Sequence, residues 1–212
     1  MPVVPALDYQ SFEACQPSLD AIKKSLSQGG VIGFPTDTFY GLGADPFNSE
    51  AVEKLFHLKR RPPTNPILVL IHDEYQLDLF TSNISEQARN LIKNFWPGPL
   101  TVLFSARDSL PDALTAGTYK IGVRLPGSKL TRKLLEKIGH PLTATSANLS
   151  EGNNPSKVEE IPKTLADQLE FIIDGGPSTA TAPSTVVDAD ASPLRIIREG
   201  AISPASIQSI VA

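Results

Sequence analysis

Residues 29–43 read GGVIGFPTDTFYGLG, and the fold prediction starts from this stretch. Just before it, Ala21, Ile22 and Leu26 recur at helical spacing, and the Gly29-Gly30 pair is typical of a helix C-terminus. The apolar run 31–34 then predicts a short buried strand. A helix that leads directly into a buried strand is the opening unit of an α/β fold.

The rest of the sequence continues this alternation of helices and strands. Asn48 or Ser49 is a suitable N-cap for a helix that Pro62-Pro63 ends. Apolar periodicity predicts further helices at 85–95, 129–138 and 204–211, and strands at 67–71, 100–104, 120–124, 142–145, 171–174, 185–188 and 194–197. We therefore predict an α/β fold on a mixed sheet of about seven or more strands.

The composition is that of an ordinary globular protein. The chain has 212 residues with 41% hydrophobic and 20% charged side chains, so we expect one domain over 1–212 with its core at about residues 15–205. Met1–Gln10 carries no export signal, and Cys15 is the only cysteine, which favours a reducing, cytoplasmic location.

A net charge of −4 gives no bulk attraction to nucleic acid, so an RNA contact would need a local basic patch such as Lys59–Arg61.

The segment 36–43 concentrates hydroxyls, a carboxylate, a phenol and two glycines directly after the predicted strand 31–34. Loops at strand ends are common ligand sites in α/β proteins, and glycine lets a ligand approach the backbone. An ordinary capped turn explains this segment equally well.

Two short pairs could bind an anion. Arg61 precedes a proline and is biased to extended geometry, so Lys59 and Arg61 can point the same way and grip a polyphosphate. Ser146 and Asn148 repeat this spacing after a predicted strand and could hold phosphates or a sugar. Taken alone, the first pair is more simply a solvated basic helix end, and the second a turn.

Arg124 ends a short apolar strand, where a partly buried guanidinium needs a carboxylate or phosphate partner. A structural ion pair with an acidic residue of the chain is the alternative.

The familiar nucleotide and catalytic motifs are missing, because the sequence has no Walker A loop, no G-x-G-x-x-G and no G-x-S-x-G. His57, His72 and His140 show no metal-ligand spacing, so we predict no protein-bound metal.

Together these segments resemble the YrdC family. The resemblance rests on Thr-Asp-Thr-Phe-Tyr-Gly-Leu at 36–42, K-x-R at 59–61, Asn65-Pro66, Trp-Pro-Gly-Pro-Leu-Thr at 96–101, S-x-N at 146–148, Pro-Ser-Thr-Val at 183–186 and Arg-Glu-Gly at 198–200. Each motif is short, but their order and spacing span nearly the whole chain and make the combination specific.

The resemblance implies an open twisted mixed sheet, with flanking helices, curved around a concave cavity. It also implies an activity, the condensation of L-threonine, bicarbonate and ATP to threonylcarbamoyl-AMP and pyrophosphate. A separate threonylcarbamoyl transferase complex would then use this product to modify adenosine 37 of tRNAs. Such chemistry needs positioning and charge neutralisation rather than a protein nucleophile.

The same resemblance assigns roles to residues at matching positions. Lys59 and Arg61 are the expected catalytic residues, Mg²⁺ is expected to arrive with ATP, and Arg124 would take the threonine carboxylate. The full ATP set is Lys59, Arg61, Asn65, Ser146, Asn148 and Arg198, and the full threonine set is Thr36, Thr38, Tyr40, Arg124 and Ser184.

The sequence departs from some relatives at two places. Leu70 stands where some carry a histidine, and Ser150-Glu151-Gly152 stands where some carry an arginine. A chain that ends near residue 212 is expected to resemble the short, single-domain bacterial form. Two other readings stay open, namely an RNA- or tRNA-binding module, and a carbamoyl-handling paralogue of the same fold without threonine activity.

Overall fold

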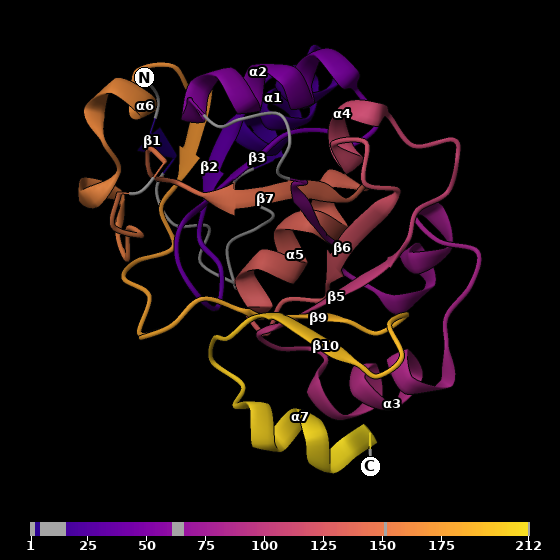
Figure 1. Cartoon of the computed structure of the whole chain (residues 1–212). Coiled ribbons are helices and arrows are strands. Elements are labelled where there is room, and N and C mark those ends of the chain that lie inside the picture. Colours follow the sequence, from indigo (N-terminus) through magenta and orange to yellow (C-terminus); the bar gives the residue numbers. More distant parts are fainter. Residues whose placement is uncertain (1–2, 5–15, 61–65, 151, 212) are drawn as a thin grey trace.

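The computed structural model describes residues 3–4, 16–60, 66–150 and 152–211. Its centre is a ten-stranded mixed sheet with the order β1-β8-β2-β3-β7-β4-β6-β5-β9-β10. The strands are β1 (Val3–Val4), β2 (Ile32–Phe34), β3 (Gly41–Gly43), β4 (Leu68–Leu70), β5 (Leu100–Ser105), β6 (Lys120–Arg124), β7 (Leu142–Ser146), β8 (Phe171–Ile173), β9 (Thr185–Asp188) and β10 (Arg195–Arg198). The α/β fold with an open mixed sheet is therefore confirmed (Figure 1).

Helices flank this sheet at the places that the apolar periodicity predicts. The α-helices are α1 (Gln16–Ser27), α2 (Ser49–Lys59), α3 (Glu86–Phe95), α4 (Asp112–Thr115), α5 (Lys129–Ile138), α6 (Lys163–Ala166) and α7 (Pro204–Val211), with short 3-10 helices at Glu74–Leu79 and Val158–Glu160. The short helices α4 and α6 and the 3-10 turns have no counterpart among the predicted elements, because segments of three to six residues carry too little periodicity.

The central strands present alternate residues to two different environments. On β4 to β6 and on β9, Val69, Val102, Val123 and Val187 face the main core, which α2, α3 and α7 also join. The intervening residues, such as Leu68, Leu103 and Val186, line a cavity on the other face. This period of two is the ordinary geometry of a strand, and here it gives each strand one core side and one cavity side.

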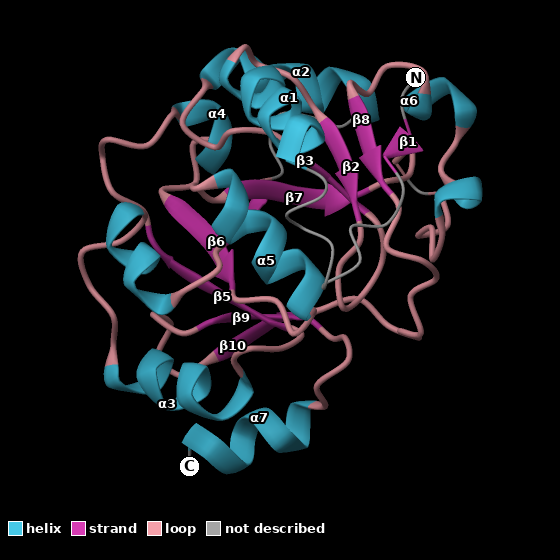
Figure 2. Ribbon diagram, turned by 180° about the vertical axis from the view of Figure 1, so that it is seen from behind, coloured by secondary structure: helices cyan, strands magenta, loops and turns pink. Residues whose placement is uncertain are grey.

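A second core cluster closes the cavity side of the sheet near β2 and β7. Leu19, Ile22 and Leu26 of α1 and Leu134 and Leu135 of α5 pack against this part of the sheet. Figure 2 shows α1 and α5 together on one side of the strands. The cavity is therefore confined to the part of the sheet that these two helices leave open.

Helix α2 begins and ends with defined caps. The Asn48 side chain accepts a hydrogen bond from the Ala51 amide at 3.1 Å, which confirms Asn48 as the cap. At the other end Arg60 adopts the left-handed conformation with φ of 51°, and its amide reaches back to the carbonyl oxygens of His57 and Phe56. Because the caps define both ends of α2, they fix Lys59 as its last residue.

The described part of the chain contains no helix with the length and apolar character that a membrane span needs.

Candidate active site

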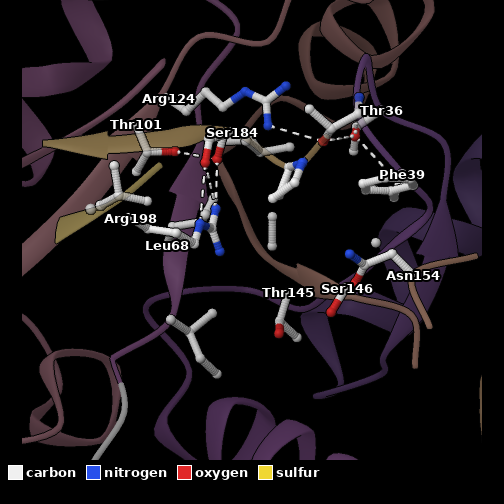
Figure 3. A pocket seen from close by; sticks show the side chains of 18 of the residues that line it. Thr36, Phe39, Leu68, Thr101, Arg124, Thr145, Ser146, Asn154, Ser184 and Arg198 are labelled. Atoms are coloured by element: carbon white, nitrogen blue, oxygen red, sulfur yellow. Dashed lines mark hydrogen bonds between the residues drawn. The ribbon is translucent and has the colours of Figure 1, made fainter. Parts of the chain in front are cut away.

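The cavity on the open part of the sheet has a volume of about 530 Å³. Its floor is apolar, formed by side chains such as Leu68, Leu103 and Val186, while arginines, hydroxyls and amides project from its walls. Figure 3 shows Thr101 and Ser184 on one side of the hollow, with Ser146 and Asn154 across from them. An apolar floor with a few converging polar groups is typical of a small-molecule site.

Arg124, the last residue of β6, is 3% exposed and lies at one end of this cavity. Its Nε donates to the Gly98 carbonyl oxygen at 3.1 Å, and Nη1 donates to Thr38 Oγ1 at 3.2 Å. Nη2 forms an ion pair with Asp37. The ion pair with an acidic residue, considered above as the alternative for Arg124, is therefore present between Arg124 and Asp37. Arg124 nevertheless also lines the cavity.

The loop between β2 and β3 supplies three of the residues expected to bind threonine. Thr36 Oγ1 lies 3.0 Å from Thr38 Oγ1 and donates to the Phe39 carbonyl oxygen at 2.7 Å. Tyr40 is fully buried, and its hydroxyl donates to the Gly176 carbonyl oxygen at 2.8 Å. Burial raises the pKa of the Tyr40 phenol to about 12; the Gly175 amide that donates to it lowers the pKa, and the neighbouring Asp174 carboxylate raises it further. Tyr40 therefore ties the 174–176 turn to the cavity wall as a neutral phenol.

Ser184 and Thr101 form a buried hydroxyl pair beside Arg198. The two hydroxyl oxygens are 2.9 Å apart, and Arg198 Nη2 donates to Ser184 Oγ, also at 2.9 Å. Arg198 also donates from Nε and Nη2 to the Ser184 carbonyl oxygen. The guanidinium thereby fixes the position of Ser184 at the junction of β5 and β9.

Lys59 lies behind the cavity wall rather than in it. The Lys59 side chain is buried, and its Nζ donates to the Asn148 carbonyl oxygen and to Asn148 Oδ1, each at 2.9 Å, and to the Ser146 carbonyl oxygen. Ser146 Oγ donates to the same Asn148 Oδ1 at 2.6 Å. Lys59 and Asn148 are not among the described residues that line the cavity, so the structure places them under the Ser146 loop.

The structure brings most of the predicted site residues together. Those that line the cavity are Thr36, Thr38, Tyr40, Arg124, Ser146, Ser184 and Arg198. Lys59 and Asn148 adjoin it through Ser146. Arg61 and Asn65 lie outside the described residues.

Thr101 and Asn154 are two of the cavity residues that the sequence analysis does not assign to the site. Thr101 stands within the Trp-Pro-Gly-Pro-Leu-Thr motif, and strand alternation could have placed it on the same side as Leu103. Asn154 carries no comparable signal, because it lies in a loop and reaches the wall through a 3.4 Å hydrogen bond that Asn148 Nδ2 donates to its Oδ1.

Comparisons with known proteins give one consistent family. The Sua5_yciO_yrdC family model, described as telomere recombination, matches residues 24–200. A threonylcarbamoyl-AMP synthase of Bacillus subtilis is 38% identical over 188 residues, which cover 88% of this chain and 54% of that protein.

Two solved structures extend this comparison. Sua5 of P. abyssi in complex with L-threonine superposes with a TM-score of 0.91 at 29% identity, covering 100% of this chain and 61% of that one. E. coli YciO superposes with a TM-score of 0.81 at 28% identity, covering 91% of this chain and 93% of that one. The chain thus spans about half the length of the Bacillus protein, 54%, and nearly all of YciO.

Proposed function

Because the chain belongs to the Sua5/YciO/YrdC family, we propose that it condenses L-threonine, bicarbonate or CO2, and ATP to threonylcarbamoyl-AMP and pyrophosphate. The observation that carries this proposal is one cavity of about 530 Å³ that holds two arginines, Arg124 and Arg198, together with neutral hydroxyls in its walls. Two separate cations suit a substrate pair that brings a carboxylate and a polyphosphate into one hollow.

The proposed reaction proceeds in two bond-forming steps. The neutral threonine amine adds to the carbon of CO2, the electrons of one C=O π bond move to its oxygen, and the nitrogen releases a proton to water to give a carbamate. A carbamate oxygen then attacks the α-phosphorus of ATP, and the bond to the bridging oxygen breaks, so that pyrophosphate leaves with the electron pair. The protein contributes positioning and charge neutralisation, for which arginines, hydroxyls and amides are sufficient.

We assign the amino-acid end of the cavity to Arg124, Thr38 and Ser184. Arg124 would hold the substrate carboxylate, and the buried hydroxyls beside it would orient the amine toward CO2. The nucleotide end is assigned to Ser146 and Arg198. Arg61 and Asn65, which lie outside the described residues, are proposed to complete the polyphosphate contacts.

Lys59 is proposed to act on ATP through the Ser146 loop. Its ammonium has three N–H donors, and the Ser146 carbonyl oxygen and both Asn148 oxygens are acceptors within reach. We therefore regard Lys59 as a positioning residue that shapes the nucleotide end.

Mg²⁺ is proposed to enter with the nucleotide. The part of the chain that the structure describes contains no group of three or more His, Cys, Asp or Glu residues suited to a metal ion. The described side chains therefore do not fit a protein-held Mg²⁺, and its ligands would be phosphate oxygens and water.

The test is to incubate the protein with ATP, bicarbonate and each amino acid in turn, and to measure pyrophosphate release and the mass of the adenylate. L-threonine should give the largest stimulation, and Arg61→Ala should abolish it without lowering the unfolding temperature. Stimulation by a different amino acid, or by none, would contradict the proposal and favour the carbamoyl-handling paralogue.

An RNA-binding module is the remaining rival. It predicts binding of tRNA that weakens steeply with salt and does not respond to threonine. The net charge of −4 speaks against this reading, although a local contact with tRNA and hand-over to a transferase complex remain part of our proposal. We also propose a cytoplasmic location, because ATP and tRNA are used there.

A further inference from the structure

Arg124 is held by three acceptors that come from two loops. They are the Asp37 carboxylate and the Thr38 hydroxyl, from the loop after β2, and the Gly98 carbonyl oxygen, from the turn before β5. A guanidinium has five N–H groups, one on Nε and two on each terminal nitrogen. The contacts of Arg124 with the described residues use one on each nitrogen, which leaves one N–H on Nη1 and one on Nη2.

One N–H on each terminal nitrogen can together bind a carboxylate with both oxygens, and Arg124 keeps one on each. Arg124 is almost fully buried in the cavity wall, so the direction of this pair is decided by its protein partners and not by solvent. Asp37 is the only one of the three partners that is charged, and its own side chain is 16% exposed. Asp37 is not among the described residues that line the cavity, so it touches Arg124 from behind.

Gly127 makes room for this arrangement. A Cβ atom added at Gly127 would lie 2.9 Å from Asp37 Oδ2 and 3.4 Å from the Cα atom of Gly98. A Cβ atom does not approach an oxygen to 2.9 Å, so a larger residue at 127 requires the Asp37 side chain to shift, while the 3.4 Å approach to Gly98 is ordinary van der Waals contact. The backbone of Gly127 does not have a positive φ, which means that alanine would fit its conformation and only the contact would change.

We propose that Asp37 and Gly127 together hold the guanidinium of Arg124 in the orientation that binds the substrate carboxylate. Asp37 is a positioning residue in this scheme, and Gly127 keeps the space that its carboxylate occupies. Asp37 also balances the buried charge of Arg124 before the amino acid binds. The two remaining N–H groups on Nη1 and Nη2, which we call the fork, are therefore already in place when the ligand enters. This inference rests on the proposed function, since it names what prepares the amino-acid end of the same site.

The test compares Asp37→Ala, Asp37→Asn and Gly127→Ala by pyrophosphate release and by calorimetry with L-threonine. Misplacing the fork should raise the threonine KM and Kd about tenfold or more in Asp37→Ala and Gly127→Ala, since small displacements of a binding group cost this much. The ATP KM should stay within about twofold of the wild type, because the nucleotide end is untouched. Asp37→Asn keeps an oxygen acceptor for Nη2 and should stay within about threefold of the wild type.

Two control variants separate positioning from loss of stability. Gly117→Ala adds a methyl group with nothing within 4 Å of it, and Asp190→Ala removes an ion pair with Lys120 outside the cavity. Both can lower the unfolding temperature, and neither should change the threonine Kd. If the Gly127→Ala protein fails to fold, Asp37→Asn against Asp37→Ala still decides the question.

The results that overturn the inference are specific. An unchanged threonine Kd in a folded Asp37→Ala protein would show that Arg124 needs no support, and a lower Kd would show that Asp37 competes with the substrate carboxylate. A wild-type protein that binds ATP but no amino acid would reject the proposed function itself. A wild-type protein that is active with threonine, combined with unaffected variants, would reject only the role of Asp37 and Gly127.

Discussion

The buried ammonium of Lys59 is expected to contribute both to the stability of the protein and to ATP binding. The ammonium donates to oxygens of Ser146 and Asn148, and these oxygens would lose a charged donor if the side chain were apolar, although Asn148 Oδ1 would keep the Ser146 hydroxyl. We expect Lys59→Met to lower the free energy of unfolding by about 2–4 kcal/mol, because buried acceptors are left unsatisfied. It should also weaken ATP binding.

Denaturant unfolding and calorimetry with ATP check this expectation. Lys54→Met is the matched control on the same helix, since the Lys54 side chain is 42% exposed and forms an ion pair with Glu170 near the surface. Its loss should cost less than about 1 kcal/mol. Equal effects of the two substitutions would show that the buried ammonium has no special role.

Tyr40 gives a prediction about pH. Its folded-state pKa is raised to about 12 from an ordinary value of 10.0, so between these values the folded protein holds a proton that the unfolded chain releases. The stabilising contribution is complete below pH 10 and is lost as the pH rises toward 12. The free energy of unfolding should therefore fall in this window.

Replacement of the phenol separates Tyr40 from other groups that titrate at high pH. The Tyr40→Phe protein should show a shallower fall, and Tyr119→Phe is the control for removal of a phenol at the surface, because Tyr119 is 78% exposed. The measurement is denaturant unfolding at several alkaline pH values. Parallel curves for the wild type and Tyr40→Phe would contradict the assigned burial effect.

At the level of single residues, the sequence predicted several of the residues that line the cavity but not the position of Lys59. The K-x-R and S-x-N pairs suggested that Lys59 would face a phosphate, yet its side chain turns inward to the Ser146 loop. Residues two apart point the same way only in an extended segment. Lys59 is instead the last residue of helix α2, and Arg60 after it adopts the left-handed conformation, so the extended geometry does not apply to Lys59. The support that Asp37 gives Arg124 was likewise invisible, because it spans 87 residues of sequence.

Helix α2 is the element whose ends matter most for the site, because Lys59 is its final residue. Asn48→Ala removes the side chain that accepts from the Ala51 amide, and it should cost about 1 kcal/mol of stability. Asn48→Asp keeps an oxygen acceptor and should cost little. Thermal or denaturant unfolding checks both, and the ATP KM should stay unchanged because the cap is a full helix away from Lys59.

The elements were predicted well where apolar periodicity is strong and poorly where glycine dominates. Strands β4 to β7 and helices α3 and α5 fall close to their predicted bounds. Strand β3, Gly41–Gly43, was read as part of a ligand loop because glycine has low strand propensity. It pairs with β2 and β7, and an added Cβ at Gly43 would lie 2.6 Å from the Phe34 ring, so packing rather than propensity selects these residues.

The molecule as a whole is organised by one sheet to which every described strand belongs. We therefore propose that the chain unfolds as one unit, as the single-domain prediction requires. Trp96 is the only tryptophan and is 8% exposed beside β5, so its fluorescence reports this region, while circular dichroism reports all helices. The two signals should give the same denaturant midpoint. Separate midpoints would indicate two independent units.

The order of the strands has a consequence for synthesis on the ribosome. Cavity residues begin at Thr36 and end at Arg198, and β9 and β10 are translated after every other wall has been made. A nascent chain that has reached Asn154 contains Leu68 and Leu103 of the apolar floor. It lacks β9 and β10, which lie next to β5 at the edge of the sheet and complete the cavity. Until Ser184 has been synthesised, we expect this incomplete cavity to expose apolar surface that a chaperone can bind, and to lack part of the proposed amino-acid site.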